Sequence, residues 1–170
     1  MNLYLRLIIL FIRSYRKPRL ALTEPSVLRF YVLPNDLDIN MHMNNGRYNS
    51  FMDLGRMDIM IRTGILKTLY KNRWIGLVGS IHTRFRRPLK LFQVCELHSQ
   101  VIYWDNKWTW IEQKIYSNGK LISSALVQTL VRSKGSNISS EELHRKMNFN
   151  IPAPEVSDEI RLLQKLNPLP

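Results

Sequence analysis

The chain has 170 residues, of which 45% are hydrophobic and 22% are charged, and its formal net charge is +12. These proportions are ordinary for a globular protein, and the length allows one domain with a proper core. The excess of cations indicates an anionic partner, such as nucleic acid, a phosphate-bearing substrate, an acidic carrier protein or anionic lipid. The sequence contains no helix-turn-helix or RNA-recognition signature, no P-loop and no Gly-x-Gly-x-x-Gly motif. Nucleic-acid binding, nucleotide hydrolysis and hydride transfer therefore lack support.

Cys95 is the only cysteine, which excludes an internal disulfide and suits a reducing compartment. It lies in the alternating run from Phe92 to His98, a pattern that predicts a structural strand residue rather than a nucleophile. The four histidines are scattered, and no Cys/His cluster has zinc spacing. We therefore expect no metal site.

Residues 1–12 read MNLYLRLIILFI and predict an N-terminal helix. Such a helix is about 18 Å long at 1.5 Å per residue, too short for a bilayer core of about 30 Å. The cations follow the apolar run and no cleavage site is present, which argues against a signal peptide. An apolar segment followed by Arg13, Arg16, Lys17 and Arg19 predicts an interfacial anchor on anionic lipid or an amphipathic helix packed on the domain or across a dimer interface. We expect a cytoplasmic protein, with peripheral membrane association through residues 1–19 as an open alternative.

The next part of the chain predicts one strand followed by one long helix. The β-branched and aromatic run from Val27 to Leu33 ends at a proline, as strands often do. From Arg47 to Arg62, apolar residues recur every three or four positions, which predicts a helix that ends near Gly64. Four further segments have strand composition and are separated in part by turn sequences: residues 74–85, 92–104, 107–116 and 120–132.

This order predicts an α+β fold, in which an antiparallel sheet of about five strands curls around one central helix. Gly55 lies in mid-helix at a cost of about 1 kcal/mol relative to Ala, which indicates close approach of the helix to a sheet or a ligand. Residues 139–147 predict a short helix, and the proline-rich tail from Asn150 predicts a loosely packed arm. The expected parts of the chain are an N-terminal segment (1–26), the main domain (27–135) and the short helix with its arm (136–170).

The stretch from Asp36 to Tyr48 carries most of the chemical information, because eight of its thirteen residues are polar and it directly precedes the helix. A carboxylate at a helix N-terminus can serve as base or nucleophile, while free backbone N–H groups hold an oxyanion. The structural alternative is an Asp/Asn-rich turn that caps the helix. We expect Asp36 to be structural, and Asp38 with its neighbours to form a chemical site.

The segment from Asp38 to Tyr48, DINMHMNNGRY, resembles the Asp-x-Asn-x-His-Val-Asn-Asn-x-x-Tyr element of acyl-thioesterases with the hotdog fold. With residues 33–38, 84–91 and 103–105 it is also similar to the thioesterase-superfamily-member-six group. The resemblance covers residues 27–135 and implies one hotdog domain that hydrolyses the thioester of acyl-CoA or acyl-carrier protein. It further implies a homodimer or homotetramer, because hotdog sites usually form between two units. No cofactor is implied beyond the coenzyme A of the substrate.

The resemblance also implies roles for particular residues. Asp38 matches the catalytic aspartate of 4-hydroxybenzoyl-CoA-type hotdog enzymes, as nucleophile or general base. Asn40 and His42 match the catalytic Asn and His of the plant acyl-carrier-protein thioesterases. Asn40 would position Asp38 or the water, and His42 would orient this network or protonate the leaving thiolate. The plant enzymes have a Glu where this chain has Pro88, so we expect no catalytic carboxylate on the second strand.

Substrate-binding candidates lie at the helix start and after the second strand. Asn45 matches the position whose backbone N–H polarises the thioester carbonyl, although helix capping is its structural alternative. Tyr48 ends the motif and is a second candidate. A basic cluster could clamp the phosphates of coenzyme A or form a solvated charged face: Arg84, Arg86, Arg87 and Lys90. The rival functions are a membrane-surface acyl-binding protein without hydrolase activity and, less favoured, a hotdog hydratase acting on enoyl-CoA.

Overall fold

The computed structural model describes residues 3–149 and 151–166, so the outermost residues of the N-terminal segment and the C-terminal arm lie outside the described part. Strands β1 to β5 form one antiparallel sheet in the order β1-β3-β4-β5-β2, and the short β6 pairs with β5. The strands are β1 (Ser26–Tyr31), β2 (Ile75–Phe85), β3 (Val94–Trp104), β4 (Thr109–Ser117), β5 (Lys120–Arg132) and β6 (Asn137–Ile138). The helices are α1 (Leu3–Arg16), the 3₁₀ turn η1 (Pro34–Asp36), α2 (Asn45–Thr63), α3 (Ile65–Asn72), α4 (Ser140–Lys146) and α5 (Asp158–Leu166).

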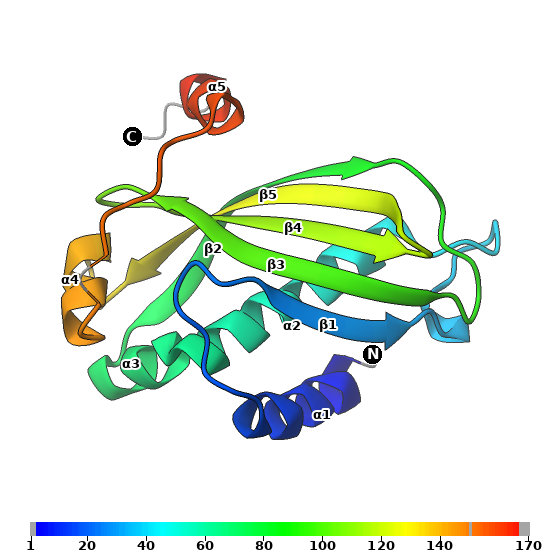
Figure 1. Ribbon diagram of the computed structural model, residues 1–170, viewed down its shortest axis with the longest axis horizontal. Helices are drawn as coiled ribbons and strands as arrows, with labels where there is room; N and C mark the ends of the chain where they lie inside the picture. The colour runs from blue at the N-terminus through cyan, green and yellow to red at the C-terminus, as the bar shows by residue number, and fades with distance from the viewer. Residues whose placement is uncertain (1–2, 150, 167–170) are drawn as a thin grey trace.

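The sheet separates the helices into two groups (Figure 1). The long helix α2 lies along one face with α1 beside it, and α5 lies over the opposite face. This arrangement confirms the predicted α+β fold with a sheet curled around one central helix. The predicted boundaries of α2 and of strands β1 to β5 lie within about two residues of the observed ones.

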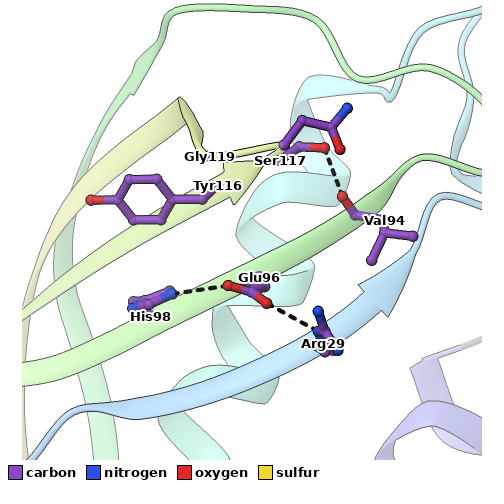
Figure 2. A pocket seen from close by; sticks show the side chains of 8 residues that line it. Arg29, Val94, Glu96, His98, Tyr116, Ser117 and Gly119 are labelled. Atoms are coloured by element: carbon purple, nitrogen blue, oxygen red, sulfur yellow. Dashed lines mark hydrogen bonds and ion pairs between the residues drawn. The ribbon is translucent and has the colours of Figure 1, made fainter.

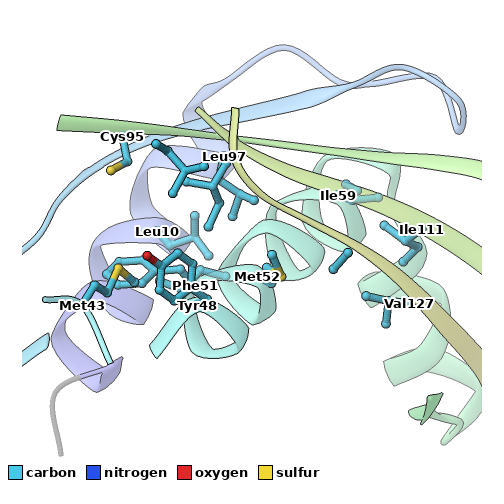
Figure 3. Close-up of a cluster of buried hydrophobic side chains, with 14 of the residues drawn as sticks. Leu10, Met43, Tyr48, Phe51, Met52, Ile59, Cys95, Leu97, Ile111 and Val127 are labelled. Atoms are coloured by element: carbon cyan, nitrogen blue, oxygen red, sulfur yellow. The ribbon is translucent and has the colours of Figure 1, made fainter. Parts of the chain in front are cut away.

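The apolar stripe of α2 fills the core between the helix and the sheet. Figure 3 shows Leu10 of α1, Phe51 and Met52 of α2, and Leu97 of β3 in one cluster. At Gly55 the helix lies directly against the sheet, since a Cβ there would lie 2.3 Å from Ser99 Oγ of β3. The expected close approach at this glycine is therefore confirmed, and its cause is the sheet.

Two helices were not predicted from the sequence. Helix α3 continues almost directly from α2 after Gly64, whose φ of 87° ends α2 in the left-handed conformation. Helix α5 corrects the expectation of a loosely packed arm for residues 158–166. Its Ile160 is 1% exposed and packs with Trp110 and Leu126 on the outer face of the sheet. The prolines before α5 suggested an unpacked tail, but they only precede a short amphipathic helix.

Helix α1 is fastened to the domain by Asp58 of α2. The fully buried carboxylate of Asp58 accepts hydrogen bonds from Ser14 Oγ of α1 and, at 2.5 Å, from Ser26 Oγ of β1. Arg62 lies 3.3 Å from the same carboxylate. Asp58 and Arg62 have the i,i+4 spacing typical of ion pairs on exposed helix faces, but here the carboxylate lies inside and joins α1, α2 and β1.

The other side of α1 remains exposed. Its inner face contributes Leu7, Leu10 and Ser14 to the domain, so the prediction of a helix packed on the domain holds for that face. The outer face carries Ile8, Ile12 and Tyr15, which are exposed and which we call the outer stripe. Tyr4, Leu5 and Ile9 are also exposed, but they border a groove between α1 and β1. None of the described helices has both the length and the apolar character needed to cross a bilayer.

Candidate active site

Asp36 organises the loop between β1 and α2. Its buried carboxylate accepts a hydrogen bond of 2.9 Å from the Leu33 N–H, lies 2.8 Å from Arg6 and 2.6 Å from Arg47. It therefore joins α1, the loop and the first turn of α2. All of its contacts are structural, in agreement with the expectation for this residue.

Asp38 lies in a tight turn that holds one of its two carboxylate oxygens. Its Oδ1 accepts hydrogen bonds from the Asn40 N–H at 2.8 Å and from the His42 N–H at 3.4 Å. The Asp38 N–H donates to the His42 carbonyl oxygen at 2.8 Å, and Met41 adopts a left-handed φ of 58°. No described residue donates a hydrogen bond to Oδ2. The turn fixes the carboxylate and leaves one oxygen available for chemistry.

Asn40 and His42 stand on either side of this turn. The Asn40 side chain is exposed and that of His42 is half-buried. Neither side chain hydrogen-bonds to a described residue, and neither caps the helix. The His42 backbone forms an antiparallel bridge with Lys90, so the turn lies against the segment after β2. Both polar side chains are thus available for a substrate, a water or a second subunit.

The start of α2 supplies hydrogen-bond donors beside the turn. Asn44 is the N-cap, and its side chain accepts a hydrogen bond of 2.9 Å from the Gly46 N–H. Asn45 is exposed, and no described group accepts a hydrogen bond from its backbone N–H. A free N–H at the positive end of a 19-residue helix is suited to hold a developing negative charge. Asn44 therefore caps the helix, and the backbone N–H of Asn45 stays available as a hydrogen-bond donor.

Tyr48 is a buried tyrosine in the first turn of α2, next to the loop, and its hydroxyl is uncharged at neutral pH. Burial raises the pKa of its hydroxyl to about 12; the charge of Asp38 acts in the same direction, while a backbone hydrogen bond from Leu89 opposes it. Its ring contacts Phe85 of β2 edge-on, with centroids 5.1 Å apart. Tyr48 therefore stays protonated at neutral pH and can shape the site or donate a hydrogen bond, but cannot act as a base.

The four cations of the predicted phosphate clamp have different surroundings. Lys90 adjoins the loop through its bridge to His42, and Arg87 donates a hydrogen bond of 2.9 Å to the Leu121 carbonyl oxygen. Arg84 pairs at 3.3 Å with Glu159 of α5, and Arg84 and Arg86 together line a cavity of about 560 Å³ beside α5 on the outer face of the sheet. Lys90 is the member of this cluster whose backbone pairs with the loop.

An apolar cavity of about 350 Å³ lies between the sheet and the helices α2 and α3. Along α2 it is lined by Ser50, Asp53, Met57 and Met60, which recur at helical spacing on one face. Arg56 also borders it, and its buried guanidinium donates to Gln113 Oε1 at 2.6 Å and pairs with Asp53. Burial lowers the pKa of Arg56, and the Asp53 charge opposes this shift. These lining residues were not predicted, although the 50-53-57-60 spacing is visible in the sequence.

A second, polar hollow of about 540 Å³ lies on the outer face of the sheet (Figure 2). Glu96 of β3 pairs there with Arg29 at 3.0 Å and lies 3.7 Å from His98. None of the predicted catalytic residues lines this hollow, so it is separate from the loop.

Strand β2 brings an open sheet edge next to the loop. It is the last strand of the β1-β3-β4-β5-β2 order, and Thr83 Oγ1 donates to Asn49 Oδ1 of α2 at 3.1 Å. Its exposed apolar residues are Ile75, Leu77, Val78, Ile81 and Phe85. A long, exposed apolar edge of this kind is a template for pairing with a strand of another chain.

Known proteins with similar sequences and folds identify the family of this chain. The profile of the Thioesterase-like superfamily matches residues 32–161. Protein THEM6 of Danio rerio is 27% identical over 150 residues, which are 86% of this chain and 72% of THEM6. The probable thioesterase YbaW of Escherichia coli has a TM-score of 0.66 at 23% identity, covering 71% of this chain and 95% of YbaW. SAV2348 of Staphylococcus aureus, solved in complex with CoA, has a TM-score of 0.64 at 17% identity, covering 84% of this chain and 95% of SAV2348.

A sheet wrapped around a central helix, with a carboxylate in the loop before that helix, defines a hotdog-fold thioester hydrolase. The chain belongs to the thioesterase-like superfamily, as its sequence motif predicted. Its similarity to THEM6 agrees with the predicted likeness to the thioesterase-superfamily-member-six group.

Proposed function

We propose that this protein hydrolyses acyl-CoA, and that the reaction takes place at Asp38 beside the start of α2. The observation that carries the proposal is that a carboxylate with one hydrogen-bonded oxygen and one oxygen without a donor lies in the loop just before a helix whose first N–H has no acceptor. Asp38 Oδ1 is held by its own turn, Oδ2 has no donor among the described residues, and the Asn45 N–H has no acceptor among them.

Each step of thioester hydrolysis then has a residue. Asp38 either attacks the carbonyl carbon, giving a mixed anhydride that a water then hydrolyses, or removes a proton from a water that attacks the thioester directly. In both routes the Asn45 N–H holds the carbonyl oxygen as it becomes negative. His42 protonates the departing thiolate, and Asn40 positions Asp38 or the water. The products are the free acid and coenzyme A.

The superfamily and the CoA complex of SAV2348 support coenzyme A as the carrier. The net charge of +12 and the position of Lys90 next to the loop suit its phosphates. The cavity of about 350 Å³ along α2 has the size and lining of a small-ligand site, and we call it the acyl chamber. None of the predicted catalytic residues lines it, but Ser50, in the second turn of the helix that begins at Asn45, does, so we propose that the acyl group extends along α2 from the loop into this chamber.

The central test measures thiol release from acyl-CoA of several chain lengths and from acyl-carrier protein. Asp38→Asn is expected to lower kcat by at least about 100-fold, the usual scale for loss of an acid–base group. Asp158→Asn is the matched control, because its side chain is 95% exposed on α5. Equal rates in wild type and Asp38→Asn would remove Asp38 from the mechanism. No release from any substrate would favour an acyl-binding protein.

A single turnover in ¹⁸O-labelled water separates the two roles of Asp38. Attack by the carboxylate forms a mixed anhydride, and its hydrolysis at the Asp38 carbonyl places the label in Asp38, whereas activation of water never labels Asp38. Mass spectrometry of the peptide that contains Asp38 detects this label, and its presence would establish attack by the carboxylate.

The site is expected to be completed by a second copy that pairs with β2. Its open apolar edge adjoins the loop through the contact between Thr83 and Asn49. Ile75→Lys, which places a charge at a 56% exposed position of this edge that does not line the cavity along α2, should convert dimers to monomers and reduce kcat together. Tyr70→Lys, at an 88% exposed position on α3, serves as the control. An Ile75→Lys protein that stays dimeric would place the interface elsewhere.

Peripheral membrane association is the second candidate property, and the outer stripe of α1 favours it. Exposed apolar residues next to Arg13, Arg16 and Arg19 suit the boundary of an anionic bilayer. Ile8→Glu and Ile12→Glu should release the protein from phosphatidylserine vesicles, while Tyr70→Glu should not. Point variants are preferable to deletion of α1, because Ser14 and Leu10 are part of the fold. Vesicle binding that survives both Glu variants would exclude the anchor.

A further inference from the structure

A groove of about 1000 Å³ runs between α1 and the edge strand β1, and Leu54 is the α2 residue that it shares with the lining of the acyl chamber. Its floor is apolar and includes Leu10, Leu28, Phe30, Phe51 and Leu54. Ligand sites in proteins commonly have such volumes, with apolar linings and a few polar groups. No residue of the predicted catalytic set lines it.

The charged residues of the groove all have one sign. Arg6, Arg13 and Lys17 follow one another along the groove side of α1, and Arg29 contributes from β1. No Asp or Glu is among the lining residues. The groove therefore combines an apolar floor with a cationic rim, which is complementary to an amphiphile with a negative head.

Arg13 is the cation best placed to receive that head. Arg6 is paired with Asp36, Arg29 with Glu96, and Lys17 lies 4.0 Å from Asp58. Arg13 has no ion-pair partner among the described residues. A guanidinium presents a planar pair of donors that matches a carboxylate in two parallel hydrogen bonds.

The length of the groove suits a single acyl chain. From Arg13 back to Tyr4, which also lines the groove, α1 spans nine residues, or about 14 Å at 1.5 Å per residue. One leaflet of a bilayer core of about 30 Å is about 15 Å thick, which is the depth that one lipid chain covers. A tail of that kind would lie over Ile9, Leu10 and Phe51.

We infer that this groove binds one long-chain fatty acid, with its carboxylate on Arg13 and its tail between α1 and β1. The inference does not depend on hydrolysis, because the groove and the catalytic loop use different residues. A second copy of the chain or a whole membrane surface are the other occupants to be distinguished.

Binding of cis-parinaric acid, a fluorescent long-chain fatty acid, to the full chain without vesicles tests this inference. Arg13→Gln and Ile9→Trp should each weaken binding at least tenfold, by loss of the head contact and by filling the groove. Arg16→Gln and Ile8→Trp are matched controls on the same helix, since neither position lines the groove. Asp38→Asn should bind as wild type does, and the methyl ester should bind as weakly to wild type as the acid binds to Arg13→Gln.

Three results would overturn the inference. Equal affinity of Ile9→Trp and Ile8→Trp would place the fatty acid elsewhere, such as in the acyl chamber. Binding seen only with vesicles would assign the cations to a membrane surface. Failure to bind the probe, together with self-association that Ile9→Trp breaks and Ile8→Trp does not, would assign the groove to a second copy. Each of these results can occur in a protein that still releases thiol from acyl-CoA, so the test of the groove is independent of the test of hydrolysis.

Discussion

Replacing Gly55 by Ala tests how closely α2 lies on the sheet. On helix propensity alone, Ala should stabilise the protein by about 1 kcal/mol. The structure predicts the opposite, because the new Cβ would lie 2.3 Å from Ser99 Oγ, 2.8 Å from Leu97 Cδ2 and 2.9 Å from Gln113 Nε2. These are far inside normal contact distances.

The neighbours of Gly55 cannot move away freely. Gln113 Nε2 donates hydrogen bonds of 2.8 Å to both the Met52 carbonyl oxygen and Ser99 Oγ. Gln113 Oε1 accepts a hydrogen bond from the Arg56 guanidinium. Overpacking a core typically costs about 1–3 kcal/mol, and a disturbed hydrogen bond about 1 kcal/mol more. After subtracting the gain in propensity, we expect Gly55→Ala to destabilise the protein by about 2 kcal/mol.

Urea unfolding followed by tryptophan fluorescence measures this change. With a slope near 2 kcal/mol per molar, the midpoint should fall by about 1 M. Adding Ser99→Ala removes the nearest atom, so the double variant should be more stable than the sum of the two single changes predicts. A midpoint that rises in Gly55→Ala would show that helix propensity dominates and that α2 does not lie this close to the sheet.

Three further predictions concern other parts of the fold. Ile160→Ala should destabilise the protein by about 2–4 kcal/mol in the same urea assay, because it leaves a cavity where Ile160 of α5 packs against Trp110. A change below about 0.5 kcal/mol would mean that α5 does not cover the sheet. Burial raises the pKa of the Cys95 thiol to about 12, so iodoacetamide at pH 8 should alkylate the urea-unfolded chain and leave the native protein unmodified by mass spectrometry. Burial lowers the pKa of His144, so the unfolded chain binds a proton at higher pH than the native protein does. The contribution of His144 to stability is therefore full above the unfolded value of about 6.5 and is lost as pH falls through the folded value. His144→Phe keeps an aromatic ring edge-on to Trp104 and should flatten this part of the pH profile, and an unchanged slope would contradict the assignment.

Features that depend on neighbours along the chain could be predicted from the sequence. Alternation and turn residues located the strands, because the period of two and the turn chemistry are local properties. The motif from Asp38 to Tyr48 located the candidate site loop because its residues are consecutive. Gly55 could be interpreted because its cost in a helix is a property of the residue itself.

Features that depend on residues far apart in the sequence could not be predicted in this way. Asp58 is a charged residue within α2, and it becomes a buried junction only because Ser14 and Ser26 donate hydrogen bonds to it. The four members of the basic cluster lie within seven residues of the sequence, but the strand alternation and the position of α5 direct Arg84 to Glu159. In each case the partner comes from another element.

The sequence by itself determined the class of this protein: a sheet, a central helix, and an Asp-Asn-His loop before that helix. Only the tertiary structure decided that Asp38 has one held and one open oxygen, that Asn45 rather than Asn44 keeps a free N–H, and that α1 walls a cationic groove. The physical reason is that local patterns specify elements and motifs, whereas burial, free hydrogen-bonding groups and cavities exist only once distant segments are packed together.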